Sequence, residues 1–214
     1  MAAEKILRTQ SAGEEAANTI SHGVGALLAL AGALPLAARG IMTGSAKTAF
    51  SLAAYGFSLV LLYTASAVYH AARRPAVKRA LRVMDHCSIF VLILGTYIPM
   101  SLLVVGGRTG WMLFLTNTTL AVVGITLNAI DLKRFDKVSL ALYAMMGWLI
   151  VVALRAIIQA LPPLGLGLLT AGGVAYTAGI LFYKSQKRYM HFVWHLFVLA
   201  GSALQYACIA LYCI

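Results

Sequence analysis

Seven apolar stretches in this chain are each about as long as a membrane-spanning helix. They run over Ser21–Ala38, Thr48–Ala72, Val83–Gly107, Thr109–Ile130, Val138–Leu154, Leu164–Tyr183 and Tyr189–Ile214. A helix needs about 20 apolar residues to cross a bilayer, whereas the strands of a membrane barrel would alternate apolar and polar residues. The sequence is 61% hydrophobic and 11% charged, which excludes a soluble domain of this size. We therefore predict an all-α integral membrane bundle of seven transmembrane helices.

Basic residues mark one side of the predicted bundle. If the seven helices alternate in direction, the side of the N-terminus holds thirteen of them: Lys5, Arg8, Arg73, Arg74, Lys78, Arg79, Arg82, Lys133, Arg134, Lys137, Lys184, Lys187 and Arg188. The other side holds four: Arg39, Lys47, Arg108 and Arg155. Because loops rich in Lys and Arg stay in the cytoplasm, we predict a cytoplasmic N-terminus and an extracytoplasmic C-terminus.

The connections between the apolar stretches are short, which indicates a single domain. We predict a polar cytoplasmic N-terminal segment over residues 1–20 and a seven-helix transmembrane domain over residues 21–214. The N-terminal segment carries Glu4, Glu14 and Glu15, and no small-residue cleavage site follows the first span. We therefore do not interpret this region as a secretory signal.

The net charge of +11 bears on the partners of the protein, and its three cysteines bear on metal ligands and disulfides. Membrane topology and attraction to anionic lipid account for the basic loops. No nucleic-acid-binding module is visible, so we expect membrane lipids rather than nucleic acid as partners. Cys87, Cys208 and Cys213 have no CxxC spacing, and we interpret them as small apolar packing residues rather than as zinc ligands or disulfides. The oligomeric state is left open.

Three histidines and one aspartate fall at one depth in the predicted spans. His70 ends the second apolar stretch, Asp85 opens the third and His191 opens the seventh, each three residues from an arginine at the membrane boundary. His195 follows one helical turn deeper, about 6 Å along the axis and on the same face as His191. Ser66 stands in the same relation to His70. Ionisable groups inside spans are energetically costly, so these residues are candidates for function.

The spacing of the histidines suits a zinc site, because a pair four residues apart can bind one metal ion from a single helix. We predict His70, His191 and His195 as ligands of Zn²⁺, for which neutral imidazoles are well suited. Three protein ligands leave a fourth position for water, which is the pattern of catalytic zinc. Bound zinc would lower the pKa of that water to about 7. We predict Asp85 and Ser66 as catalytic residues: Asp85 could hold the water or accept its proton, and Ser66 could orient it or bind a developing oxyanion.

Simpler interpretations remain open for the same residues. A single membrane histidine is usually a hydrogen-bonded packing residue, Asp85 could pair with a loop arginine, and Ser66 could bond its own backbone. His86 follows Asp85 directly and would point about 100° away from it on a helix, so we interpret it as lying outside the ligand set.

Asn18, Ser21 and His22 fall on about one face of the first predicted helix. Asn18 or Ser21 could cap that helix. Alternatively, the three residues form a polar cluster that meets the site from the first helix.

Four polar motifs carry a resemblance to a known family. They are Glu15-x-x-Asn18-x-x-Ser21-His22-Gly23, Ser66-x-x-x-His70, Asp85-His86-Cys87-Ser88-Ile89 and His191-x-x-x-His195. As a group they resemble the hemolysin III branch of the progestin and adipoQ receptor family, over essentially the whole chain. The resemblance implies a multi-pass protein of the bacterial inner (cell) membrane, with zinc bound by His70, His191 and His195 near the cytoplasmic face.

The resemblance supports two hypotheses of function. The receptor branch and the related alkaline ceramidases imply a zinc-dependent hydrolase of a lipid amide or ester, with Asp85 and Ser66 close to the metal-bound water. The alternative is a channel-forming cytolysin or membrane-homeostasis protein with a structural zinc, since the hemolysin III branch is named for a cytolytic, pore-like activity. The spans lack a polar stripe through the full membrane, which favours the hydrolase. Whether the protein is an enzyme depends on this choice.

Overall fold

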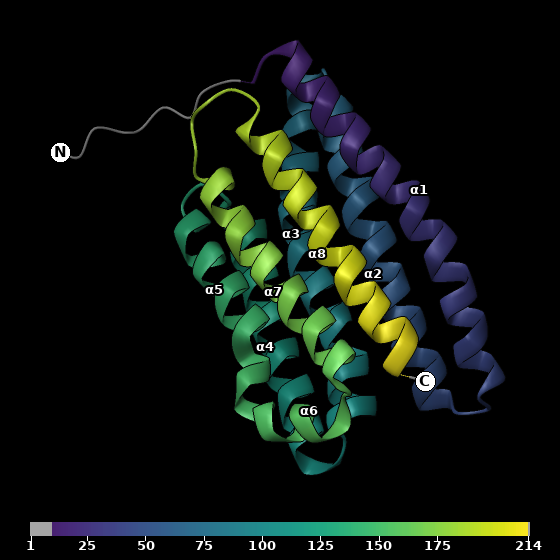
Figure 1. The fold of residues 1–214 in the computed structure, drawn as a ribbon. Helices are drawn as coiled ribbons and strands as arrows, with labels where there is room; N and C mark the ends of the chain where they lie inside the picture. The colour runs from purple at the N-terminus through teal and green to yellow at the C-terminus, as the bar shows by residue number, and fades with distance from the viewer. Residues whose placement is uncertain (1–9, 214) are drawn as a thin grey trace.

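The computed structural model describes residues 10–213, which form a bundle of helices without a strand in that range (Figure 1). The helices are α1 (Ala12–Met42), α2 (Ala46–Ala71), α3 (Pro75–Pro99), α4 (Gly107–Asp131), α5 (Asp136–Trp148), α6 (Leu154–Ala160), α7 (Pro163–Tyr183) and α8 (Met190–Tyr212). A π-helical segment, η1 (Met100–Val105), extends α3, and a 3-10 segment, η2 (Leu149–Ala153), joins α5 to α6. The described residues thus contain seven spans of sufficient length and apolarity, which confirms the predicted fold class.

The first helix begins well before its apolar stretch. Ser11 caps it: the Ser11 hydroxyl accepts a hydrogen bond from the Glu14 backbone N–H at 3.3 Å, and the Glu14 carboxylate accepts one from the Ser11 N–H at 2.9 Å. This reciprocal capping box satisfies two donors that a helix start leaves unpaired. As a result α1 starts at Ala12 rather than near Ser21, and its first turns carry polar residues along the bundle.

Two spans change their helical geometry part-way. Pro99 lacks a backbone N–H, and the chain continues from it as the wider η1 until Gly106, whose φ is +62°. The fifth span tightens into η2 after Trp148 and recovers as α6. That span ends at Ala160, ahead of two prolines, and is therefore longer than the predicted stretch that ended at Leu154.

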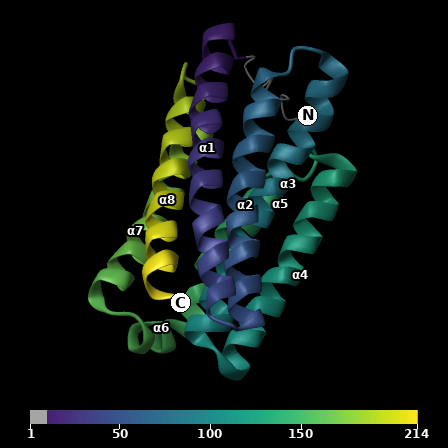
Figure 2. The same cartoon turned by 90° about the vertical axis from the view of Figure 1, so that its right-hand side faces the viewer.

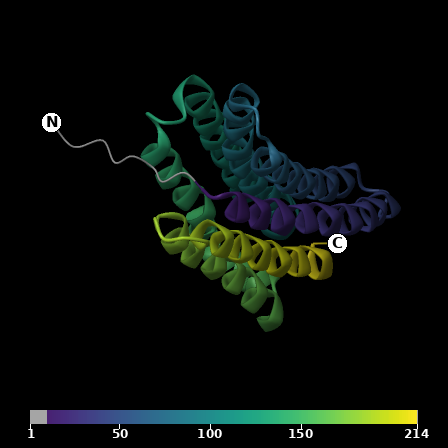
Figure 3. The ribbon, with the colours of Figure 1, turned by 90° about the horizontal axis from the view of Figure 1, so that it is seen from above.

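The helices pack with α1 between α2 and α8 (Figures 2 and 3). Next to them, α3 packs against α2, α4 against α3, and α7 against α8. Gly56 allows α1 and α2 to approach closely, because a Cβ on it would lie 2.8 Å from that of Ala33. The largest buried apolar cluster joins several of these helices and includes Leu36, Tyr55, Leu59, Ile157 and Ile209.

The outer surface of the bundle is apolar. Large side chains that face outward include Leu27 on α1, Phe57 on α2, Trp111 on α4 and Val152 in η2, which is 76% exposed. A soluble protein rarely exposes so continuous an apolar surface. The exposure therefore agrees with lipid contact around the whole bundle and with a multi-pass membrane protein.

The basic connections lie together at one end of the bundle. The α2–α3, α4–α5 and α7–α8 connections are all at the end where α1 begins, and α8 ends at the opposite end (Figures 1 and 2). This confirms the predicted grouping of the basic loops. Lys5 and Arg8 lie outside the described residues.

We predict that the end with the basic connections faces the cytoplasm, since Lys and Arg in short loops resist translocation. A reporter that works only outside the cytoplasm should be active when it is fused after Ile214. A reporter that works only in the cytoplasm should be active when it is fused before Met1. A C-terminal reporter active in the cytoplasm would contradict the orientation. A reporter inserted in the α2–α3 connection is an internal control, because it should behave like the one at the N-terminus.

Candidate metal centre

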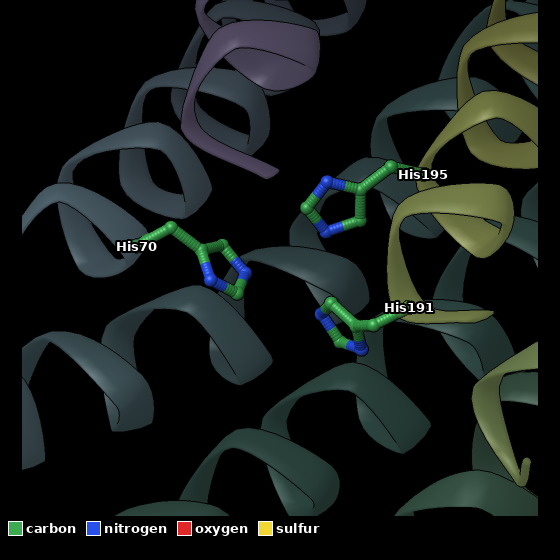
Figure 4. Close-up of side chains that lie close together, drawn as sticks. All are labelled: His70, His191 and His195. Atoms are coloured by element: carbon green, nitrogen blue, oxygen red, sulfur yellow. The ribbon is translucent and has the colours of Figure 1, made fainter. Parts of the chain in front are cut away.

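Three histidines from two helices meet near the basic end of the bundle. His70 lies in the last turn of α2, and His191 and His195 lie in the first two turns of α8 (Figure 4). One side-chain nitrogen from each lies within 4.8 Å of the other two. His195 is fully buried and His70 is 3% exposed. The structure therefore brings together the three residues that we predicted as zinc ligands.

The free nitrogens of this cluster fit a metal ion. Nε2 of His70, of His191 and of His195 is buried without a hydrogen-bond partner. A buried polar atom without a partner is unfavourable, and metal coordination is one way to satisfy it. Zinc–nitrogen distances of about 2.0–2.1 Å require closer spacing than 4.8 Å, so the three nitrogens would have to move closer together around a bound ion.

A contact from α1 fixes the start of α8, and hence the histidine pair. The α8 helix follows Tyr189, whose φ is +60°. The backbone N–H of Tyr189 donates a hydrogen bond to Oε1 of Glu14 at 2.8 Å. From that start, His191 and His195 are four residues apart and project from one face, as expected for a helix.

Polar residues of α1 surround two of the histidines. Nδ1 of His70 lies 2.7 Å from Oε2 of Glu15, and Nδ1 of His195 lies 3.1 Å from Oγ of Ser21. The His22 ring stacks on the His195 ring, with 3.5 Å between centroids and 9° between planes. This supports the interpretation of a polar cluster that meets the site from the first helix. Our sequence analysis did not predict the contact of Glu15 with His70, although the spacing of Glu15, Asn18 and Ser21 by three residues is its signal.

Asp85 and Ser66 lie close to each other in the interior, on α3 and α2. Both are buried, with 5% and 1% of their surface exposed. The Ser66 side chain lies close enough to the Asp85 carboxylate to interact with it, although its hydroxyl makes no hydrogen bond of ordinary geometry. Ser66 therefore does not bond its own backbone, which was the simpler interpretation. The roles predicted for both residues stay predictions.

The two remaining histidines lie outside the cluster of three. Nδ1–H of His86 donates to the backbone oxygen of Arg82 at 2.9 Å, and the same nitrogen lies 3.6 Å from Oδ2 of Asp85. Both ring nitrogens of His22 are buried without a partner. Its stacked position places it beside His195 rather than opposite it, so we do not expect it to be a ligand.

An elongated cavity of about 270 Å³ begins beside His22, whose ring stacks on that of His195. Asp85, His22 and Trp194 line one end, and the Trp194 ring lies 5.2 Å from that of His195. The cavity then continues between α3, α5, α6, α7 and α8 to Met100 and Ile157. From Asp85 to Met100 this is about 22 Å along the helix axis at 1.5 Å per residue. Most of the lining side chains are apolar, and the cavity was not predicted from the sequence.

Comparison with known proteins identifies the family. The family model described as "Haemolysin-III related" matches residues 10–206. The chain belongs to this haemolysin III-related family. It is similar to "Hemolysin-3" of Bacillus cereus, with 39% identity over 98% of this chain and 96% of the relative. It is also similar to "Hemolysin-3 homolog" of Bacillus subtilis (strain 168), with 37% identity over 94% and 95% of the two chains.

A more distant relative comes from an animal. "Monocyte to macrophage differentiation factor" of Homo sapiens is 28% identical over 71% of this chain and 66% of its own length. These matches confirm the family resemblance that the four polar motifs indicated. As a haemolysin III-related protein, the chain is a multi-pass membrane protein whose three histidines could bind a metal ion.

We predict that the purified protein binds one zinc ion through the three histidines. Replacement of His70, His191 or His195 by Ala should remove most of the zinc, because each change removes one of three protein ligands. His86→Ala is the matched control and should keep about one equivalent. Elemental analysis of the purified variants provides the measurement. Full zinc content in all three ligand variants would contradict the site, and loss of zinc in His86→Ala would show that the ligand set is wrong.

Proposed function

We propose that this protein is a zinc-dependent hydrolase of the bacterial inner (cell) membrane that cleaves an amide or ester bond in a membrane lipid. One observation carries the proposal: a long apolar cavity is lined at one end by Asp85, His22 and Trp194, and the rings of His22 and Trp194 pack against that of His195. Such a cavity suits an acyl chain, and the polar residues at its end suit the carbonyl group to which an acyl chain is attached.

The residues at this end fit the chemistry of hydrolysis. A zinc ion held by His70, His191 and His195 would polarise a carbonyl and acidify its bound water. The Asp85 carboxylate would accept the proton of the attacking water and return it to the leaving amine or alcohol. The Ser66 hydroxyl has no other partner and could donate a hydrogen bond to the oxyanion that forms. Hydrolysis would consume one water and release a fatty acid.

The position of the site also suits a lipid substrate. The histidines lie in the last turn of α2 and the first turns of α8, at the end of the bundle that carries the basic connections. A lipid whose chain enters the cavity would hold its headgroup near those basic residues, which attract anionic groups at the membrane surface. The cleaved bond would then lie just below the headgroups.

A channel-forming cytolysin or a membrane-homeostasis protein with a structural zinc is the alternative. It is favoured by the name of the Bacillus cereus relative, "Hemolysin-3". The mainly apolar lining of the cavity argues against an ion pathway through one chain, because ion pathways are lined by carbonyl oxygens or charged side chains. We therefore prefer the hydrolase.

Asp85→Asn should retain zinc but lose activity, because the amide cannot accept the proton. We expect a loss of about 10²–10⁴-fold, the usual contribution of a general base. Ser66→Ala should lower activity by less than Asp85→Asn. The measurement is release of free fatty acid from a panel of amide-linked and ester-linked lipids by purified, zinc-loaded protein.

The same purified, zinc-loaded protein also distinguishes the hydrolase from the channel. Zinc-dependent release of fatty acid that requires Asp85 would support the hydrolase. No release from any lipid of the panel, together with bilayer conductance that His191→Ala abolishes, would replace the hydrolase with the channel.

Blocking the cavity should impair hydrolysis without loss of zinc. Gly173 on α7 lines the cavity, and a Cβ added to it would meet no other atom within 4 Å. Gly173→Leu should therefore fold normally but occupy space needed by the acyl chain, raising KM for long-chain lipids more than for short-chain ones. Gly167→Leu is the control, since Gly167 is exposed on the same helix and has equally open surroundings. Equal kinetics of both variants on all chain lengths would contradict the role of the cavity.

A further inference from the structure

One face of α1 contacts two of the three metal-site histidines without supplying a ligand of its own. Glu15, Asn18 and Ser21 follow at intervals of three residues, and His22 comes directly after them. Residues at this spacing lie on one side of a helix. Because α1 packs between α2 and α8, this face meets His70 on one neighbour and His195 on the other.

The contact of Glu15 determines which nitrogen of His70 is free. Oε2 of Glu15 lies 2.7 Å from Nδ1 of His70, and Oε1 of Glu15 accepts a hydrogen bond from Nζ of Lys78 at 2.8 Å. An ionised carboxylate can only accept hydrogen bonds, so Nδ1 of His70 must carry the proton. Nε2 of a neutral ring then has a lone pair for the metal. Asn18 Nδ2 also lies 3.5 Å from Nδ1, but the shorter contact with the carboxylate is the stronger one.

The contact of Ser21 has the same consequence for His195. The Ser21 hydroxyl donates its single proton to the backbone oxygen of Asn18 at 3.0 Å. It can therefore only accept a hydrogen bond from Nδ1 of His195, which lies 3.1 Å away. Nδ1 of His195 must then be protonated, and Nε2, which is buried without a partner, is free to bind a metal.

His22 restricts the orientation of the His195 ring. The two rings are stacked at 3.5 Å, and Tyr63 packs against His22 in a T-shaped contact with 5.0 Å between centroids. A ring held on its face and at Nδ1 has little freedom to rotate. Nε2 of His195 therefore stays directed toward the other two histidines.

We infer that Glu15 and Ser21 are positioning residues, which set the tautomer and orientation of His70 and His195 and thereby the strength of metal binding. This inference rests on the metal-binding part of the proposed function and not on hydrolysis. Residues that accept a hydrogen bond from a metal-bound histidine also make the ring a better ligand, and their loss typically lowers metal affinity about 10–100-fold. Glu15 should contribute more than Ser21, because hydrogen bonds to charged groups are about twice as strong as neutral ones.

The test is the dissociation constant for zinc, measured by competition with a chelator. Glu15→Ala should weaken binding about 10–100-fold. Glu15→Gln should weaken it less, because the amide oxygen can still accept the hydrogen bond from Nδ1 but carries no charge. Ser21→Ala should weaken it by about 10-fold, the lower end of that range.

Two matched controls should bind zinc like the unmodified protein. Asp131→Asn makes the same change from carboxylate to amide as Glu15→Gln, at an exposed position on α4. Thr19→Val removes a hydroxyl from α1 that bonds only to the backbone oxygen of Glu15 in the same helix.

A measurement of thermal stability with and without zinc separates positioning from a purely structural role. We expect the Glu15 and Ser21 variants to lose mainly the increase in Tm that zinc produces. Unchanged zinc affinity, or an equal drop in Tm with and without zinc, would overturn the inference. If the unmodified protein bound no zinc, this inference and the metal site would both fail, whereas zinc binding without lipid hydrolysis would overturn the proposed function alone.

Discussion

Three buried imidazole nitrogens without hydrogen-bond partners lie together where the end of α2 meets the start of α8. Each unsatisfied buried group costs about 1–3 kcal/mol, so the arrangement is unfavourable unless something coordinates the three nitrogens together. The packing around them maintains this arrangement. Glu14 fixes the start of α8 through the backbone of Tyr189, and the next residue, Glu15, holds His70. The capping box at Ser11 orders the same turn of α1.

Two groups of helices form the two parts of the candidate site. The α1, α2 and α8 helices hold the histidines and the residues around them, while α3, α5, α6 and α7 provide most of the cavity wall. Asp85 stands where the two groups meet, because it comes from α3, interacts with Ser66 on α2 and lines the end of the cavity. The polar end of the cavity therefore combines the Asp85 carboxylate with His22 and Trp194, whose rings pack against His195.

Several of these features could be predicted from the sequence because they depend on local patterns. Span lengths and basic loops determine the number of helices and the end at which His70 and His191 lie. The interval of four residues places His195 on the same face as His191. The contact of Glu15 with His70 was not predicted, since it depends on how far α1 extends before its apolar stretch. That extension begins at the capping box of Ser11 and Glu14, whose Ser-x-x-Glu spacing is a local signal of a helix start. The partner of Glu15 on α2, in contrast, depends on how the two helices pack.

The cavity was unpredictable for a different reason. Its walls are made of apolar side chains that also occur on lipid-facing surfaces, and no periodic pattern distinguishes Ile89 or Leu169, which line it, from Leu27, which faces outward. Residues of the π-helical and 3-10 segments after Pro99 and Trp148, among them Met100 and Ile150, also line the far end of the cavity. Which apolar residues surround a cavity depends on the packing of five helices at once, and a single sequence does not encode that in any local signal.

X-ray absorption at the zinc edge of the purified, zinc-loaded protein tests the metal centre most directly, because it reports the ligand atoms themselves. The account predicts a shell of nitrogen and oxygen ligands only, with imidazole nitrogens at about 2.0–2.1 Å. It also predicts that the contribution of one imidazole disappears when His70 is replaced by Ala and the site is reloaded with excess zinc. Sulfur ligands at about 2.3 Å, which would implicate a cysteine, or a spectrum unchanged by the His70 replacement would contradict the account.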